Sequence, residues 1–132
     1  MKQDQNWLAE MESRRRDDEP SPGQEMAALM RRTDEVLKGL SPKDGAKLRE
    51  LSAGWRELVL AGYALSCGYA PHTADGVGEL LTAAPEGAAW RAENLRLTRA
   101  AEALASTVPE ALPLSDRWDD LCTLALVLGQ RR

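Results

Sequence analysis

Apolar residues recur every three or four positions along most of the chain, which is the spacing of one face of an α-helix. The clearest run covers residues 48–65, where steps of three and four alternate and fit no strand period. Residues 77–84 form a second apolar face, and Pro85 ends it. The pattern predicts an αα-hairpin, a long helix followed by a turn and a second helix. The stripe on the long helix consists of Leu48, Leu51, Trp55, Leu58, Gly62 and Leu65.

The start of the long helix is marked by capping residues. Ser41 and Pro42 fit an N-cap and a first helical position, and Asp44 lies where a carboxylate favours a helix N-terminus. Two glycines within this helix each weaken it by roughly 0.5–1 kcal/mol relative to alanine. We therefore expect Gly62, on the apolar stripe, to let a neighbouring helix approach closely, and Gly54 to mark a kink or a break.

Three further segments show helical spacing. Residues 24–40 and 88–106 each carry one apolar face, and Ser115 is placed to cap a final helix. Within that helix, residues 121–128 are apolar nearly all round, which fits a buried helix, a strand, or a surface completed by a partner; the length favours a helix. The sequence thus predicts an all-α fold, a small helical domain built from antiparallel helix hairpins.

The N-terminal segment is more polar. Residues 1–16 carry a narrow apolar strip that predicts a short helix, and they end in three arginines, after which come three acidic residues and a proline-rich stretch. We expect residues 1–23 to form a short helix and a solvated charged linker, and residues 24–132 to form a single helical domain. Trp7 either packs back onto this domain or contacts a partner.

Composition and charge narrow the functional classes. The chain is 43% hydrophobic and 5% aromatic, without phenylalanine, so its core must consist mainly of leucine, alanine, valine and tryptophan. The formal net charge is −4, and the cations are interleaved with acidic residues. Because binding to phosphate backbones requires clustered cations, a nucleic-acid partner is not expected.

The cellular compartment is predicted from what the sequence lacks. Cys67 and Cys122 are far apart in the chain, and there is neither a signal-peptide pattern nor an apolar run long enough for a membrane helix. We expect a reduced, cytoplasmic protein that does not insert into membranes. A disulfide between the two cysteines is the less favoured interpretation.

The turn after the long helix contains the residues that an active site would require. Cys67, His72 and Asp75 match the residue types of a nucleophile, a base and an orienting acid, but closeness in sequence does not supply the geometry of a triad. A structural zinc site needs four ligands. We interpret Cys67 as a small buried residue and His72 as a solvent-facing one. Thr73 or Asp75 would cap the next helix. The sequence therefore predicts no enzymatic activity, no catalytic residue, no metal site and no cofactor.

The hairpin resembles the tetratricopeptide type of helical repeat. Gly78 stands where a larger side chain is usual, Pro85 arrives one position early, and no second copy follows, because Arg96 and Arg99 occupy positions that should be small or apolar. The resemblance implies a tetratricopeptide-like arrangement in the middle of the domain. It is carried by Leu58, Ala61, Gly62, Leu65, Ala74 and Leu81.

Among such proteins, the hairpin is similar to the small tetratricopeptide-type chaperones of bacterial type III secretion. This resemblance implies a cytoplasmic chaperone or adaptor that holds a helical or extended apolar segment of an exported or secretion-apparatus protein. Homo- and hetero-oligomers are both compatible with it. The residues that carry it are Gly62-Tyr63, Cys67-Gly68-Tyr69-Ala70, Leu80-Leu81-Thr82 and Pro85-Glu86.

A protein-binding role also follows from the apolar pattern itself. The hairpin cannot bury every apolar side chain by itself, so surplus apolar surface would meet the flanking helices or form a groove for a partner helix. The alternative is a helical transcriptional or regulatory protein that acts on DNA, but residues 73–84 contain acidic side chains and no lysine or arginine. The predicted partner-binding residues are Trp55, Leu58, Gly62, Leu65, Leu121, Leu124 and Leu128.

Overall fold

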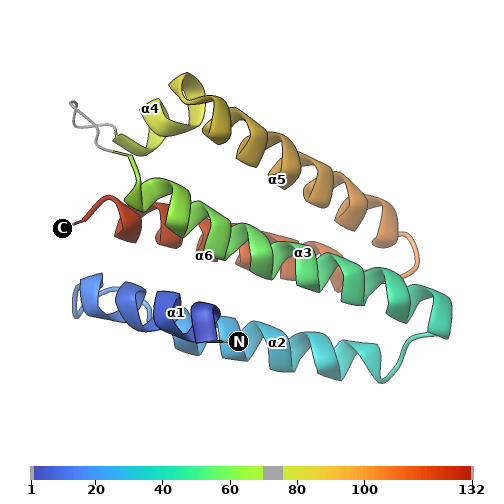
Figure 1. Cartoon of the computed structure of the whole chain (residues 1–132). Helices are drawn as coiled ribbons and strands as arrows, with labels where there is room; N and C mark the ends of the chain where they lie inside the picture. Colours follow the sequence, from blue (N-terminus) through green and yellow to red (C-terminus); the bar gives the residue numbers. More distant parts are fainter. Residues whose placement is uncertain (1, 70–75, 132) are drawn as a thin grey trace.

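The computed structural model describes residues 2–69 and 76–131 and folds this part of the chain into six α-helices without any strand (Figure 1). The predicted all-α class is confirmed. The helices are α1 (Lys2–Arg14), α2 (Pro22–Leu37), α3 (Pro42–Cys67), α4 (Gly76–Ala83), α5 (Pro85–Leu104) and α6 (Ala111–Gly129).

The helices form three layers, with α3 and α6 in the middle (Figure 1). Helix α5, with α4 packed on it, lies on one side of this central pair, and α1 and α2 lie on the other. No helix in the described part of the chain is both long and apolar enough to cross a lipid bilayer.

Two helices begin with the same capping arrangement. In α3 the backbone N–H of Asp44 donates to the side chain of Ser41, as the sequence predicts. In α2 the N–H of Gln24 donates to the side chain of Ser21 in the same way. Helix α2 therefore starts inside the stretch that was expected to be a linker, because a proline directly after a serine cap is compatible with the first helical position.

The predicted hairpin of residues 48–84 is not the packing that the described residues show. Helix α4 packs on α5 rather than back along α3, and the apolar stripe of α3 is covered by α5 and α6. With eight residues against 26, α4 is too short to cover that stripe. The contact between α4 and α5 is very close, because a Cβ atom on Gly87 would clash with the carbonyl oxygen of Leu80.

The core is centred on aromatic side chains of the central layer and of α5. Trp55 of α3 and Trp118 of α6 stack with their ring centroids 6.3 Å apart. The indole of Trp90 in α5 lies over Gly62 and donates to the Leu58 carbonyl oxygen at 2.9 Å, which confirms the close approach predicted at this glycine. Leu51, Trp55, Leu58, Trp90, Leu97 and Leu121 are buried, whereas Leu65 and Leu81 are half-buried.

The C-terminal helix differs from its prediction at its start. Helix α6 begins at Ala111, and Pro113 fits into its first turn, where the backbone N–H that proline lacks would have no helical partner. Ser115 consequently lies within the helix and is buried instead of capping it. The apolar run that follows belongs to the core, because α6 lies between the two outer layers and is covered on both sides.

The N-terminal segment packs onto the domain. Met11 is fully buried and Trp7 is half-buried against the core. The guanidinium of Arg14 donates to the carbonyl oxygen of Gly129 at 3.2 Å and lies over the ring of Tyr63. The expected solvated linker is therefore corrected at both ends, because Arg14 bonds to α6 and Glu19 forms an ion pair with Arg131, which follows α6.

Candidate functional site

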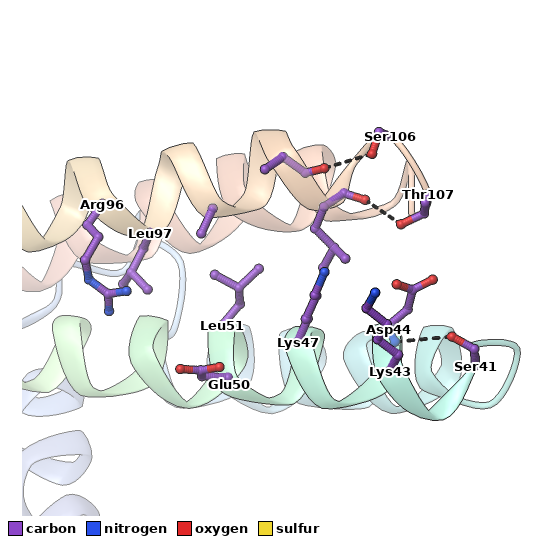
Figure 2. A pocket seen from close by; sticks show the side chains of 13 residues that line it. Ser41, Lys43, Asp44, Lys47, Glu50, Leu51, Arg96, Leu97, Ser106 and Thr107 are labelled. Carbon is purple, nitrogen blue, oxygen red and sulfur yellow. Dashed lines mark hydrogen bonds between the residues drawn. The ribbon is translucent and has the colours of Figure 1, made fainter.

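A groove of about 580 Å³ lies between the first half of α3 and the second half of α5 (Figure 2). Its apolar floor consists of leucines from both helices, and small residues of α5 form part of its wall. The connection between α5 and α6 closes one end. The α3 side contributes Lys43, Asp44, Lys47, Glu50 and Leu51, and the α5 side contributes Arg96, Leu97, Ala100, Ala103 and Leu104.

The groove exists because the side chains between these two helix halves are short. Ala103 is exposed and Ala100 half-buried, and neither reaches across to α3. The floor leucines Leu51 and Leu97 are themselves buried, so they offer only their ends to the groove. The flexible stem of Lys47 extends from α3 into the gap (Figure 2). The groove therefore has an apolar base, and flexible charged side chains surround it.

The cations around the groove differ in their partners. Arg96 forms an ion pair with Glu93, one turn earlier in α5, and its Nε lies 3.0 Å from a carboxylate oxygen. That hydrogen bond lowers the pKa of Glu93 and raises the pKa of Arg96. Lys43 and Lys47 are exposed, and within the described residues neither has an ion-pair partner.

The hydroxyl groups at the end of the groove are used by the protein itself. Ser106 donates to the carbonyl oxygen of Ala103 at 2.9 Å, and Thr107 donates to that of Leu104 at 3.3 Å. Both carbonyls lie at the end of α5, and the Leu104 oxygen also accepts from the backbone N–H groups of Thr107 and Val108. Ser41 is engaged as the cap of α3. The polar groups left for a ligand are therefore mainly the charged side chains of the rim.

The seven residues predicted to bind a partner are not gathered in this groove. Within the core, Trp55 and Leu58 are 2% and 4% exposed, and Leu121 and Leu128 are 4% and 0% exposed. Gly62 is buried under Trp90. Only Leu65 and Leu124 keep some exposed surface, and they belong to different helices, α3 and α6. The apolar stripe of α3 was interpreted as surplus surface available to a partner, but α5 and α6 of the same chain cover it.

The chemistry considered for the turn has no described site. Cys67 is exposed, against its prediction, because it is the last residue of α3, and it accepts a 3.3 Å hydrogen bond from Arg14. The other two members of the proposed triad, and Thr73, lie outside the described residues. Burial raises the pKa of the Cys122 thiol to about 12, and both thiols are free. No cluster of three or more metal-binding side chains occurs in residues 2–69 and 76–131.

The lysines and alanines that line the groove were missed in the sequence because they belong to the polar faces of two helices. Lys43 and Lys47 lie one helical turn apart, and Ala100 and Ala103 are likewise neighbours on one face of α5. Each pair is typical of an ordinary exposed helix surface. Only the packing of α3 against α5 places the two pairs on opposite sides of one cavity.

No protein-family model matches the sequence, and no curated protein or solved structure matches it either. The groove and its lining are therefore the observations on which a function can be argued.

Proposed function

We propose that this chain is a helical protein-binding module of the chaperone or adaptor class, which holds a segment of another protein in the groove between α3 and α5. The observation that carries the proposal is the groove itself, with leucines at its floor and charged side chains on its rim. An amphipathic segment matches this arrangement, since its apolar face would meet the floor and its polar edges would meet the rim.

The dimensions of the groove favour a short peptide segment. Its α3 side extends from Ser41 to Leu51, which corresponds to about 15 Å at the rise of an α-helix. A ligand helix of this length has two to three turns, enough for a few apolar anchor side chains. The alanines of α5 would let the ligand backbone come close to that wall.

The resemblance to type III secretion chaperones provides a biological setting for this proposal. In that setting the bound segment belongs to an exported or secretion-apparatus protein, and binding takes place in the bacterial cytoplasm. The contact surface differs from the one predicted from sequence. The stripe around Trp55 and Leu58 stabilises the fold, and the groove near Leu51 and Ala103 receives the partner.

Filling the groove tests this proposal. Ala103→Trp places a large side chain at an exposed groove position, and Ala89→Trp makes the same change at an exposed position of α5 that does not line the groove. Tagged wild type and both variants are recovered from cells of the native source and the bound material is identified by mass spectrometry. Unfolding curves first confirm that both variants are folded.

The expected result is a protein that is recovered with wild type and with Ala89→Trp but lost with Ala103→Trp. Equal recovery by all three chains, or no protein with any of them, contradicts the proposal. Recovery of a specific nucleic acid in place of a protein would instead favour the regulatory alternative.

A further inference from the structure

We infer that the segment held in the groove is acidic, and that its carboxylates pair with Lys43 and Lys47. This inference rests on the proposed function and specifies the chemistry of the partner. The two lysines are the cations of the groove that have no ion-pair partner within the described residues. The lining of the groove carries three cations, Lys43, Lys47 and Arg96, against the two carboxylates of Asp44 and Glu50, although the whole chain has a net charge of −4.

The acidic residues of the groove do not cancel these two lysines. Asp44 lies in the first turn of α3, where its carboxylate interacts favourably with the positive end of the helix dipole. Glu50 contributes to raising the pKa of Arg96, so its charge acts on the arginine of the opposite wall. The local balance therefore favours an anionic ligand near the start of α3.

The spacing of the lysines specifies the ligand further. Lys43 and Lys47 are four residues apart on one helix, so their attachment points are roughly 6 Å apart. Two carboxylates separated by one turn of a ligand helix have the same spacing, and each can reach one ammonium group. The long lysine stems would cover the apolar side chains that the ligand places on the floor.

Two synthetic peptides of about four helical turns provide the test. Both carry the same leucine stripe; one has glutamates along its flanks and the other has lysines. Binding is measured by fluorescence anisotropy at low and high salt. We expect wild type to bind the glutamate peptide at least tenfold more tightly than the lysine peptide, with a preference that weakens as salt screens the charges.

Charge reversal supplies the matched variants. The double variant Lys43→Glu, Lys47→Glu should lose at least tenfold in affinity for the glutamate peptide and gain affinity for the lysine peptide. The control, Arg31→Glu with Arg49→Glu, makes the same change in net charge at two exposed positions outside the groove and should keep the wild-type preference. Lys43→Glu is compatible with folding, because an acidic side chain is favourable in the first turn of a helix.

The inference is overturned if wild type binds both peptides equally, if it binds neither, or if the control loses as much as the groove variant. These outcomes are separate from the test of the proposed function. If Ala103→Trp abolishes partner recovery while the peptides show no charge preference, the groove binds protein but does not select acidic segments. If Ala103→Trp has no effect, the proposed function itself fails.

Discussion

The interface between α3 and α5 is closed in one half and open in the other. In the closed half, a Cβ atom on Gly62 would lie 3.0 Å from Nε1 of Trp90, so the indole packs directly on the α3 backbone. In the open half, leucines and alanines leave a groove of about 580 Å³ (Figure 2). The same two helices thus hold the domain together at one end and provide a cavity at the other.

The difference follows from the residues that face each other. A tryptophan against a glycine fills the space between two helices and gains a buried hydrogen bond to the carbonyl oxygen of Leu58. In the open half, alanines face the flexible stem of Lys47 and fill much less of the space between the two helices. Tight packing and ligand space are therefore separated along one helix pair, and substitutions in the two halves should have different effects.

The largest contrast is expected for leucine truncation. Leu58→Ala in the closed half should destabilise the protein by about 2–5 kcal/mol, because it leaves an enclosed cavity. Leu51→Ala should have a smaller effect, because the space it leaves is continuous with the groove. Chemical denaturation of the two variants measures the difference, and an equal loss of stability would show that the two halves are packed alike.

The glycines of α3 give a second contrast. Gly62→Leu should destabilise the protein by about 1–3 kcal/mol through overpacking against Trp90, although leucine is the better helix former. A Cβ atom on Gly54 would lie 2.9 Å from Cδ2 of Leu97, which is the end of a flexible side chain beside the groove. Gly54→Ala should therefore leave stability unchanged or raise it by up to about 1 kcal/mol.

Denaturation midpoints at constant slope test this pair as well. A higher midpoint for Gly62→Leu would show that Trp90 can leave Gly62 at no cost. A large loss for Gly54→Ala would show that Leu97 has no room to move toward the groove, and the open half would then be less adaptable than its volume indicates.

Lowering the pH should have a smaller effect on stability, through an ion pair at the closed end of the α3–α5 interface. Glu19 forms an ion pair with Arg131 near the ends of α3 and α6, and hydrogen bonds from the Arg131 side chain and the Arg16 backbone lower the pKa of Glu19 to about 2. Its ordinary value is 4.5. The stability that this carboxylate supplies is therefore complete above about pH 4.5 and is lost as the pH falls toward 2.

Glu19→Gln isolates this effect. The thermal midpoint of wild type should exceed that of the variant near neutral pH, and the two values should converge between about pH 4.5 and pH 2. A difference that stays constant over this range would mean that the ion pair contributes no pH-dependent stability. Increased salt should also reduce the difference, because the pair is partly exposed.

The fold could be predicted from sequence where the signal was local. The helical period, the Ser41 cap and the close approach at Gly62 each depend on neighbouring residues in the chain, and the structure confirms all three. The same serine–proline signal at Ser21 was assigned to the charged linker, whereas in the structure Ser21 caps α2. Ser115 was wrongly read as a cap because proline is uncommon in helices, although it is tolerated in a first turn.

The site could not be predicted because it depends on which helices pack together. The apolar stripe of α3 indicates that a partner is needed, but it does not distinguish α5 and α6 of the same chain from another protein. Trp55 and Leu121 were therefore expected at a binding surface and lie in the core. Lys47 and Ala103 carry no signal of their own, because a lysine and an alanine on the polar face of a helix are ordinary surface residues.

Site-specific photo-cross-linking measures directly whether the open half of the α3–α5 interface receives a partner. A photoreactive phenylalanine derivative replaces Ala103 in the groove or Ala89 elsewhere on α5, and cells of the native source are irradiated. We expect a defined cross-linked protein from position 103 and none from position 89. Equal cross-linking from both positions, or none from position 103, would contradict the assignment of the groove as the binding site.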